Sequence, residues 1–197
     1  MRCRANSFSM TPLIDRFHHT LDLWIEALAD YSWEELCLVP APGSWSLGQL
    51  YGHLLEDTDF YRTQIQQCGC TSAHSQEEAT AEGRALLAAD DFPERLRGGP
   101  SNDQVAQPPG KETLLRDLQR LRSAMQQAAQ DLQHCSYRGK TPHPGLGYFS
   151  GEEWLQFAEM HLRHHLRQKQ RIDAFLLQTG RVRGSRQAPD DPARKTG

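Results

Sequence analysis

The stretch SGEEWLQFAEMHLRHHLRQKQRIDAFLLQT, residues 150–179, has the strongest bearing on the fold of this chain. Ser150 and Glu153 have the spacing of a capping box at the start of a helix, and Gly180 is a typical residue at a helix end. Residues at alternating intervals of three and four define a stripe that should face a core. The stripe contains Trp154, Ala158, His161, His165, Gln168, Ile172 and Phe175. Two histidines are therefore expected inside the protein.

Three further segments show the same three-four alternation of apolar residues, namely residues 11–31, 47–68 and 111–137. Ser46 and Gln49 form a second capping box at the start of the 47–68 helix. No segment has a convincing strand pattern. Four helices with one apolar stripe each can bury those stripes by facing them inward. The sequence therefore predicts an all-α fold, a four-helix bundle with a long connection between its second and third helices.

The long connection is expected to contain a short accessory helix. Ser75 and Glu78 have capping-box spacing before an alanine-rich stretch that ends near Asp90. Residues 92–110 are rich in Gly, Pro and Asn, which indicates an irregular loop.

The length of 197 residues favours one domain, which we place at residues 10–179. Residues 1–9 would form an N-terminal extension, and the polar, basic residues 180–197 a disordered tail. The net charge of −3 argues against nucleic-acid binding, and the short apolar runs argue against a membrane span. No secretory signal is evident and the five cysteines form no CxxC pair, so we expect a soluble, cytoplasmic protein with reduced thiols.

The spacing of His161 and His165 suits a shared metal ion. An unsatisfied polar group in an apolar seam costs about 1–3 kcal/mol, and residues four apart on a helix can reach one ion together. An HxxxH pair alone is a weak signal, but His53, between Leu50 and Leu54 on the second helix, can face it across the bundle. We therefore predict that His53, His161 and His165 bind a metal. A metal-free bundle with hydrogen-bonded histidines is the alternative.

Other polar residues lie near these histidines in the predicted helices. His164 is rotated about 100° from His165 on the helix, which favours a position at the rim. Gln168, one turn after His165, could orient a ligand. Asp57, Tyr61 and His164 are the candidates for acid, base or supporting roles in catalysis. We expect His143, in a loop near the bundle end, to be structural.

Two stretches resemble the DinB-like superfamily: GSWSLGQLYGHL at residues 43–54 and EEWLQFAEMHLRHHLRQ at residues 152–168. The resemblance covers residues 10–178 and implies a four-helix bundle with one histidine on the second helix and an HxxxH pair on the last. The metal triad of that family falls on His53, His161 and His165. Its members include thiol-dependent transferases, isomerases and proposed metal-dependent hydrolases. Residues 141–149 resemble a poorly characterised branch, so the resemblance implies a site rather than one reaction.

Three histidines on two helices would leave part of the coordination sphere of a divalent metal open for water or substrate. Imidazole ligands suit zinc, which we expect first, and nickel, which we expect second. The expected function is a metal-dependent enzyme, either a hydrolase or a thiol-dependent transferase, acting on a small molecule or a thiol. The alternative is a noncatalytic bundle that is stabilised by metal or binds a small ligand. A homodimer is compatible with this fold.

Overall fold

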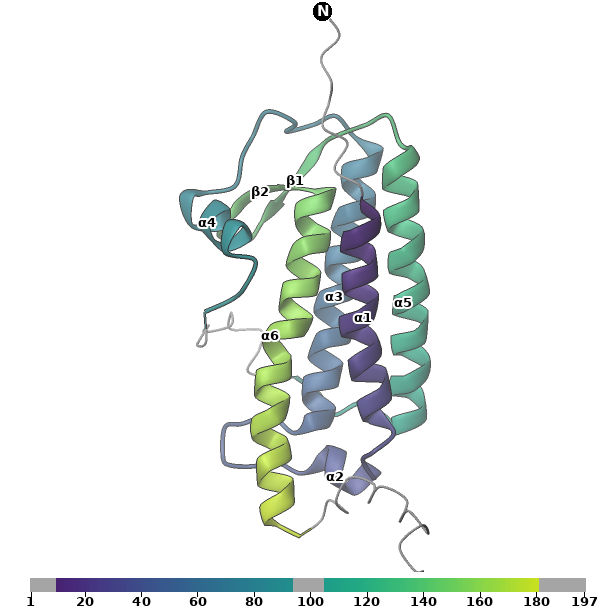
Figure 1. Ribbon diagram of the computed structural model, residues 1–197, viewed down its shortest axis with the longest axis vertical. Coiled ribbons are helices and arrows are strands. Elements are labelled where there is room, and N and C mark those ends of the chain that lie inside the picture. Colours follow the sequence, from purple (N-terminus) through teal and green to yellow (C-terminus); the bar gives the residue numbers. More distant parts are fainter. Residues whose placement is uncertain (1–9, 94–104, 181–197) are drawn as a thin grey trace, which may run out of the picture.

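The computed structural model describes residues 10–93 and 105–180. Four long helices lie side by side along the molecule (Figure 1). They are α1 (Met10–Leu28), α3 (Leu47–Cys70), α5 (Lys111–His134) and α6 (Gly151–Gln178). Helix α3 packs between α5 and α6, and α1 contacts the same two helices. The predicted four-helix bundle is therefore confirmed, and the second and last helices of the bundle are neighbours.

The two predicted capping boxes set the starts of α3 and α6. The Ser46 hydroxyl accepts the N–H of Gln49, whose side chain accepts the Ser46 N–H in return. Ser150 and Glu153 make the same pair of bonds. Each box satisfies N–H groups that the first turn of a helix leaves without partners. As a result, the registers of the two helices that carry the histidines are fixed at their first turns.

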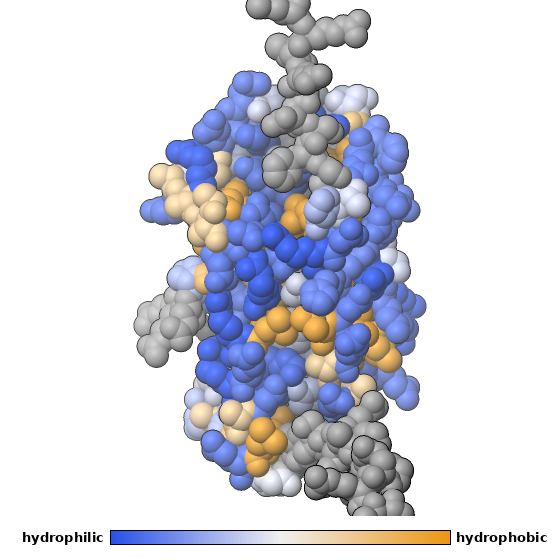
Figure 2. All heavy atoms as spheres, viewed as in Figure 1, coloured by the Kyte–Doolittle hydropathy of each residue, from blue (hydrophilic) through white to orange (hydrophobic). Residues whose placement is uncertain are grey.

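The core lies between the four long helices. Its largest fully buried side chains include Trp24, Trp154, Tyr51 and Phe17. The indole of Trp24 donates to the carbonyl of Leu162, and the Tyr51 hydroxyl donates to the carbonyl of Trp24. These bonds connect α1, α3 and α6 inside the core. On the face shown in Figure 2, hydrophilic residues cover most of the surface and hydrophobic residues form smaller patches. None of the helices within residues 10–93 and 105–180 has the length and apolar character that crossing a membrane requires.

Two small elements were not predicted from the sequence. A five-residue helix, α2 (Trp33–Cys37), follows α1, and a β-hairpin, β1 (Lys140–His143) with β2 (Gly147–Ser150), precedes α6. The strands are antiparallel, with Lys140 opposite Ser150. Gly145 and Gly147 have φ values of +94° and +83°, which side chains rarely adopt and which the tight reversal requires. The hairpin is an addition to the four long helices, and it contributes the fully buried ring of Phe149 to their core.

The accessory helix is present as α4 (Ala81–Ala89), but its predicted cap is wrong. Thr80, not Ser75, accepts a hydrogen bond from the backbone of the first turn, at Gly83. Ser75 lies in a turn, and the carbonyl of Glu78 accepts the N–H of Tyr148 from the hairpin. Pairing with the hairpin therefore takes up the backbone that would have formed the predicted first turn. The predicted extension 1–9, residues 94–104 of the predicted loop and residues 181–197 of the predicted tail lie outside the described residues.

Candidate metal centre

The three predicted histidines lie together between α3 and α6. The Nε2 atom of His165 is 3.2 Å from Nε2 of His53 and 3.1 Å from Nε2 of His161. All three side chains are buried, and their ligand atoms lie within 4.8 Å of one another. Two ligands that are each about 2.0–2.1 Å from one ion, at tetrahedral or octahedral angles, are about 2.9–3.4 Å apart. The observed separations therefore fit a shared divalent metal.

Gln168 fixes the tautomer of His165. Its side-chain oxygen lies 2.9 Å from Nδ1 of His165 and can only accept, so Nδ1 carries the hydrogen and Nε2 presents a lone pair. That lone pair can accept an N–H from one neighbour with good geometry, whereas both His53 and His161 approach it. A cation would satisfy all three nitrogens at once. Through this contact Gln168 can orient the His165 ring, as its position one turn after His165 predicts.

Burial keeps these imidazoles neutral. Desolvation lowers the pKa of His53 to about 4. Desolvation and, to a lesser degree, the neighbouring His53 lower the pKa of His165 to about 3. The pKa of His161 is lowered well below its ordinary value, first by desolvation and then by the other histidines. The neutral form is the one that binds a metal, so the cluster is ready for ligation at neutral pH. Against this, the buried Nδ1 of His161 has no hydrogen-bond partner among the described residues, a cost that ligation has to offset.

The carboxylate of Asp57, on α3, lies beside the histidine cluster. Its Oδ2 atom lies 3.6 Å from Nε2 of both His53 and His161. The Tyr61 hydroxyl donates to the same oxygen over 3.4 Å. The Asp57 side chain is 35% exposed, so it connects the buried nitrogens with solvent. Burial raises the pKa of Asp57 to about 6, although the hydrogen bond from Tyr61 opposes the rise. Asp57 can therefore exchange a proton near neutral pH.

The structure places His164 and His143 away from the three Nε2 atoms. His164 accepts a hydrogen bond from Arg167 at Nδ1, and its ring packs 5.5 Å from the ring of Phe92. Burial, followed by the charge of Arg167, lowers its pKa. His143, on β1, packs against the ring of Trp154 with their centroids 5.3 Å apart. The His143 ring therefore packs outside the cluster, whereas the His164 ring packs against both Phe92 and His165.

Two aromatic residues near the cluster received no role in the sequence analysis. The ring of Trp45, just before α3, lies 4.8 Å from the ring of His53. The ring of Phe92 lies 6.4 Å from that of His161. Trp45 could have been suspected because it is close in sequence to the start of α3. Phe92 lies in a segment that resembles an ordinary loop, and only the folded chain brings it to α6.

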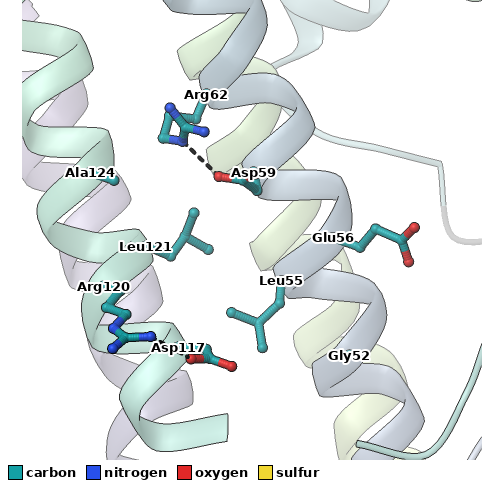
Figure 3. Close-up of a pocket in the computed structure, with 9 residues that line it drawn as sticks. All are labelled: Gly52, Leu55, Glu56, Asp59, Arg62, Asp117, Arg120, Leu121 and Ala124. Carbon is teal, nitrogen blue, oxygen red and sulfur yellow. Dashed lines mark hydrogen bonds and ion pairs between the residues drawn. The ribbon is translucent and has the colours of Figure 1, made fainter. Parts of the chain in front are cut away.

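A separate hollow of about 430 Å³ lies between α3 and α5 (Figure 3). Two charged pairs line it, Arg62 with Asp59 and Arg120 with Asp117. The nine residues that line this hollow do not include any of the three clustered histidines, which lie between α3 and α6 instead. The hollow is therefore not the entrance to the candidate metal centre.

Comparison with known proteins agrees with this geometry. The sequence pattern of the DinB superfamily matches residues 16–168. A solved structure with a similar fold is described as "YfiT from Bacillus subtilis is a probable metal-dependent hydrolase with an unusual four-helix bundle topology". It superposes with a TM-score of 0.56 at 13% sequence identity, over 91% of this chain and 93% of that one, which shows a shared fold. A comparison with curated proteins gave no match. Since the family match includes the whole histidine cluster and most of the bundle, this chain belongs to the DinB superfamily.

Proposed function

We propose that this protein is a metal-dependent hydrolase that binds one divalent metal through Nε2 of His53, His161 and His165. Zinc is the first expectation for three imidazole ligands and nickel the second. The observation that carries the proposal is the convergence of three neutral imidazoles from two helices, with the carboxylate of Asp57 3.6 Å from two of them. The printed description of YfiT as a probable metal-dependent hydrolase supports the same reaction class.

The three histidines would hold the metal, and their number would leave a coordination position for water or substrate. A zinc ion with three protein ligands and a free position makes water acidic enough to attack at neutral pH, or binds a thiol as its thiolate. Gln168 keeps His165 in the tautomer that presents Nε2. Trp45 and Tyr61 pack against the rings of His53 and His161, which limits the access of bulk water to the ligands.

Asp57 is the proposed general base. Its pKa of about 6 would let it take a proton at Oδ2 near neutral pH, and its oxygen is 3.6 Å from two of the proposed ligand atoms, which supports this role. Tyr61 donates to the same oxygen and so orients the carboxylate. Zinc lowers the pKa of bound water only to about 7, whereas a zinc-bound thiol is fully deprotonated. A nearby base is therefore of more use to the attack of water, and Asp57 supports hydrolysis over thiol transfer.

The test combines metal analysis with turnover. Protein purified without chelator should contain about one zinc or nickel per chain and hydrolyse at least one member of a panel of small esters, amides and phosphate esters. Asp57→Asn should retain the metal and lose most of the hydrolysis, by about 100-fold or more if Asp57 is the base. Asp59→Asn is the matched control, because Asp59 lies two residues away and pairs with Arg62 outside the cluster.

The outcomes separate the competing functions. Turnover that requires an added thiol would identify a thiol-dependent transferase instead. A full complement of metal without turnover of either kind would favour a noncatalytic metal-stabilised or ligand-binding bundle. A protein that neither contains nor takes up metal would contradict the proposed site altogether.

A further inference from the structure

The turn that follows α4, formed by Asp90, Asp91 and Phe92, is held against the bundle by several side chains. We call it the Asp90–Phe92 turn. Arg16 of α1 binds both carboxylate oxygens of Asp90, each over 2.8 Å. From α6, Gln156 donates to Asp90 over 2.9 Å, and Arg163 donates to the Asp90 carbonyl over 2.8 Å. Residues of two helices thus fix a single short segment of the long connection.

Arg167 fixes the second half of the same turn. Its guanidinium donates to the carboxylate of Asp91 over 3.0 Å and to the carbonyl of Phe92 over 2.8 Å. It also donates to Nδ1 of His164 over 3.0 Å. Since a guanidinium presents its donors in a rigid fork, one side chain sets the position of both the turn and the His164 ring. Arg167 lies only two residues after His165, so the turn is coupled directly to the helix that carries two of the proposed ligands.

The turn presents Phe92 to the candidate metal centre. The Phe92 ring packs 5.0 Å from Phe157, 5.5 Å from His164 and 6.4 Å from His161. It is only 6% exposed. Asp90 has a φ of +50°, an unusual backbone conformation for a residue other than glycine. Asp90 is the C-cap of α4, in the left-handed conformation in which helices often end, and the Phe92 ring two residues later packs on α6.

Ordinary core packing would not require this arrangement. Phe92 packs on one phenyl ring, but its other two aromatic neighbours are imidazoles, one of them a proposed ligand. An apolar ring beside a metal ligand limits the space in which a bound molecule can extend on that side. Three arginine side chains, each partly exposed, maintain its position by hydrogen bonds to the Asp90–Phe92 turn.

We infer that Phe92 is a specificity-determining wall of the metal centre, and that Arg163 and Arg167 are positioning residues that hold it there. The substrate class is a small molecule whose apolar group beside the metal is compact. Bulkier groups meet the Phe92 ring. This inference rests on the proposed function, because it requires a metal at the three histidines.

The test measures ligand size directly on the metal and does not depend on turnover. Cobalt(II)-substituted protein is titrated with imidazole and with 4-phenylimidazole, and the visible absorption of the cobalt reports binding. Phe92→Ala should improve the affinity for 4-phenylimidazole relative to imidazole by about tenfold or more. Leu87→Ala is the matched control, because Leu87 is a similarly buried residue of α4 near the same turn, and it should leave the ratio unchanged. Phe92→Leu should give an intermediate ratio of the affinity for 4-phenylimidazole to that for imidazole. This variant tests the same inference if Phe92→Ala does not fold.

The cobalt titration separates a failure of the metal site from a failure of the role of Phe92. Wild-type protein that takes up no cobalt would refute the proposed function. Cobalt-loaded Phe92 variants whose ratio equals that of the Leu87→Ala protein would refute the wall and leave the metal site standing.

The positioning role has its own variants. Arg167→Ala should raise the affinity for 4-phenylimidazole relative to imidazole, as Phe92→Ala does, because the turn loses the bonds from Arg167 to Asp91 and Phe92. Arg62→Ala, which removes an arginine on the other side of α3, should not shift this ratio (Figure 3). An unchanged ratio in cobalt-loaded Arg167→Ala protein would contradict the positioning role.

Discussion

Replacing His165 with alanine should remove most of the metal affinity, whereas replacing the adjacent His164 should not. Nε2 of His165 lies 3.2 Å and 3.1 Å from the corresponding atoms of His53 and His161, so both other nitrogens approach it. His164 instead accepts a hydrogen bond from Arg167 and packs on the Asp90–Phe92 turn. The two variants remove the same side chain from neighbouring positions of α6, but only one of them changes the candidate metal centre.

The size of the effect follows from the number of ligands. Structural zinc sites with four protein ligands bind with about 10–16 kcal/mol, so one ligand contributes about 3 kcal/mol, or roughly 100-fold in affinity. His165→Ala should therefore weaken zinc binding about 100-fold or more. The His164 ring makes a packing contact with His165, at a centroid distance of 5.1 Å. His164→Ala should weaken binding by about tenfold at most, the low end of what the loss of a supporting group costs.

The assay is competition for zinc between each apoprotein and a chromophoric chelator at pH 7.5. Circular dichroism and urea unfolding establish that both variants are folded before their affinities are compared. A His164→Ala protein without metal, beside a fully loaded His165→Ala protein, would refute both the ligand assignment and the helix register on which it depends.

Three further predictions concern the surroundings of the site. Gln168→Ala should weaken zinc binding about 10–100-fold in the same competition assay, because Nδ1 of His165 loses its acceptor, whereas Gln168→Glu should retain affinity. Glu159 is 1% exposed and paired with Arg163, so Glu159→Ala should reduce the free energy of unfolding in urea by about 3 kcal/mol. Burial lowers the pKa of His53 to about 4 and that of His165 to about 3, from 6.5 in the unfolded chain. At these two histidines the unfolded state therefore binds more protons below pH 6.5, and each should contribute a loss of about 1.4 kcal/mol of stability per pH unit between pH 6.5 and 4 in metal-free protein. Asp57, whose pKa is raised to about 6, opposes part of this loss.

Each of these predictions has a control. Wild-type affinity in Gln168→Ala would show that the bond to Gln168 does not orient the ligand. Asp117→Ala removes an exposed ion pair and should cost less than about 1 kcal/mol; an equal loss for Glu159→Ala would contradict the importance of burial. A variant with glutamine at both His53 and His165 should show a flatter dependence of stability on pH, and an unchanged slope would assign the pH effect to other groups.

The long helices of this protein were predictable because their signals are local. A capping box joins residues three apart, as at Ser46 and Ser150, and an apolar stripe repeats within each helix. The hairpin escaped prediction because its four-residue strands are too short for a recognisable alternation, and their conformation depends on pairing with each other and with Ala79. The cap of α4 was assigned wrongly for the same reason, since the hairpin occupies the backbone before Thr80.

The sequence by itself determined the helical class and the common face of His161 and His165, because the rise and turn of one helix fix the relation between residues four apart. It also selected His53 as the third candidate, through the stripe of the second helix. Only the tertiary structure decided that Asp57 stands 3.6 Å from two of the three nitrogens and that Phe92 packs beside them. Distances between helices depend on how their side chains interdigitate, and the place of a loop residue depends on contacts such as those of Arg167, which residue spacing along the chain does not encode.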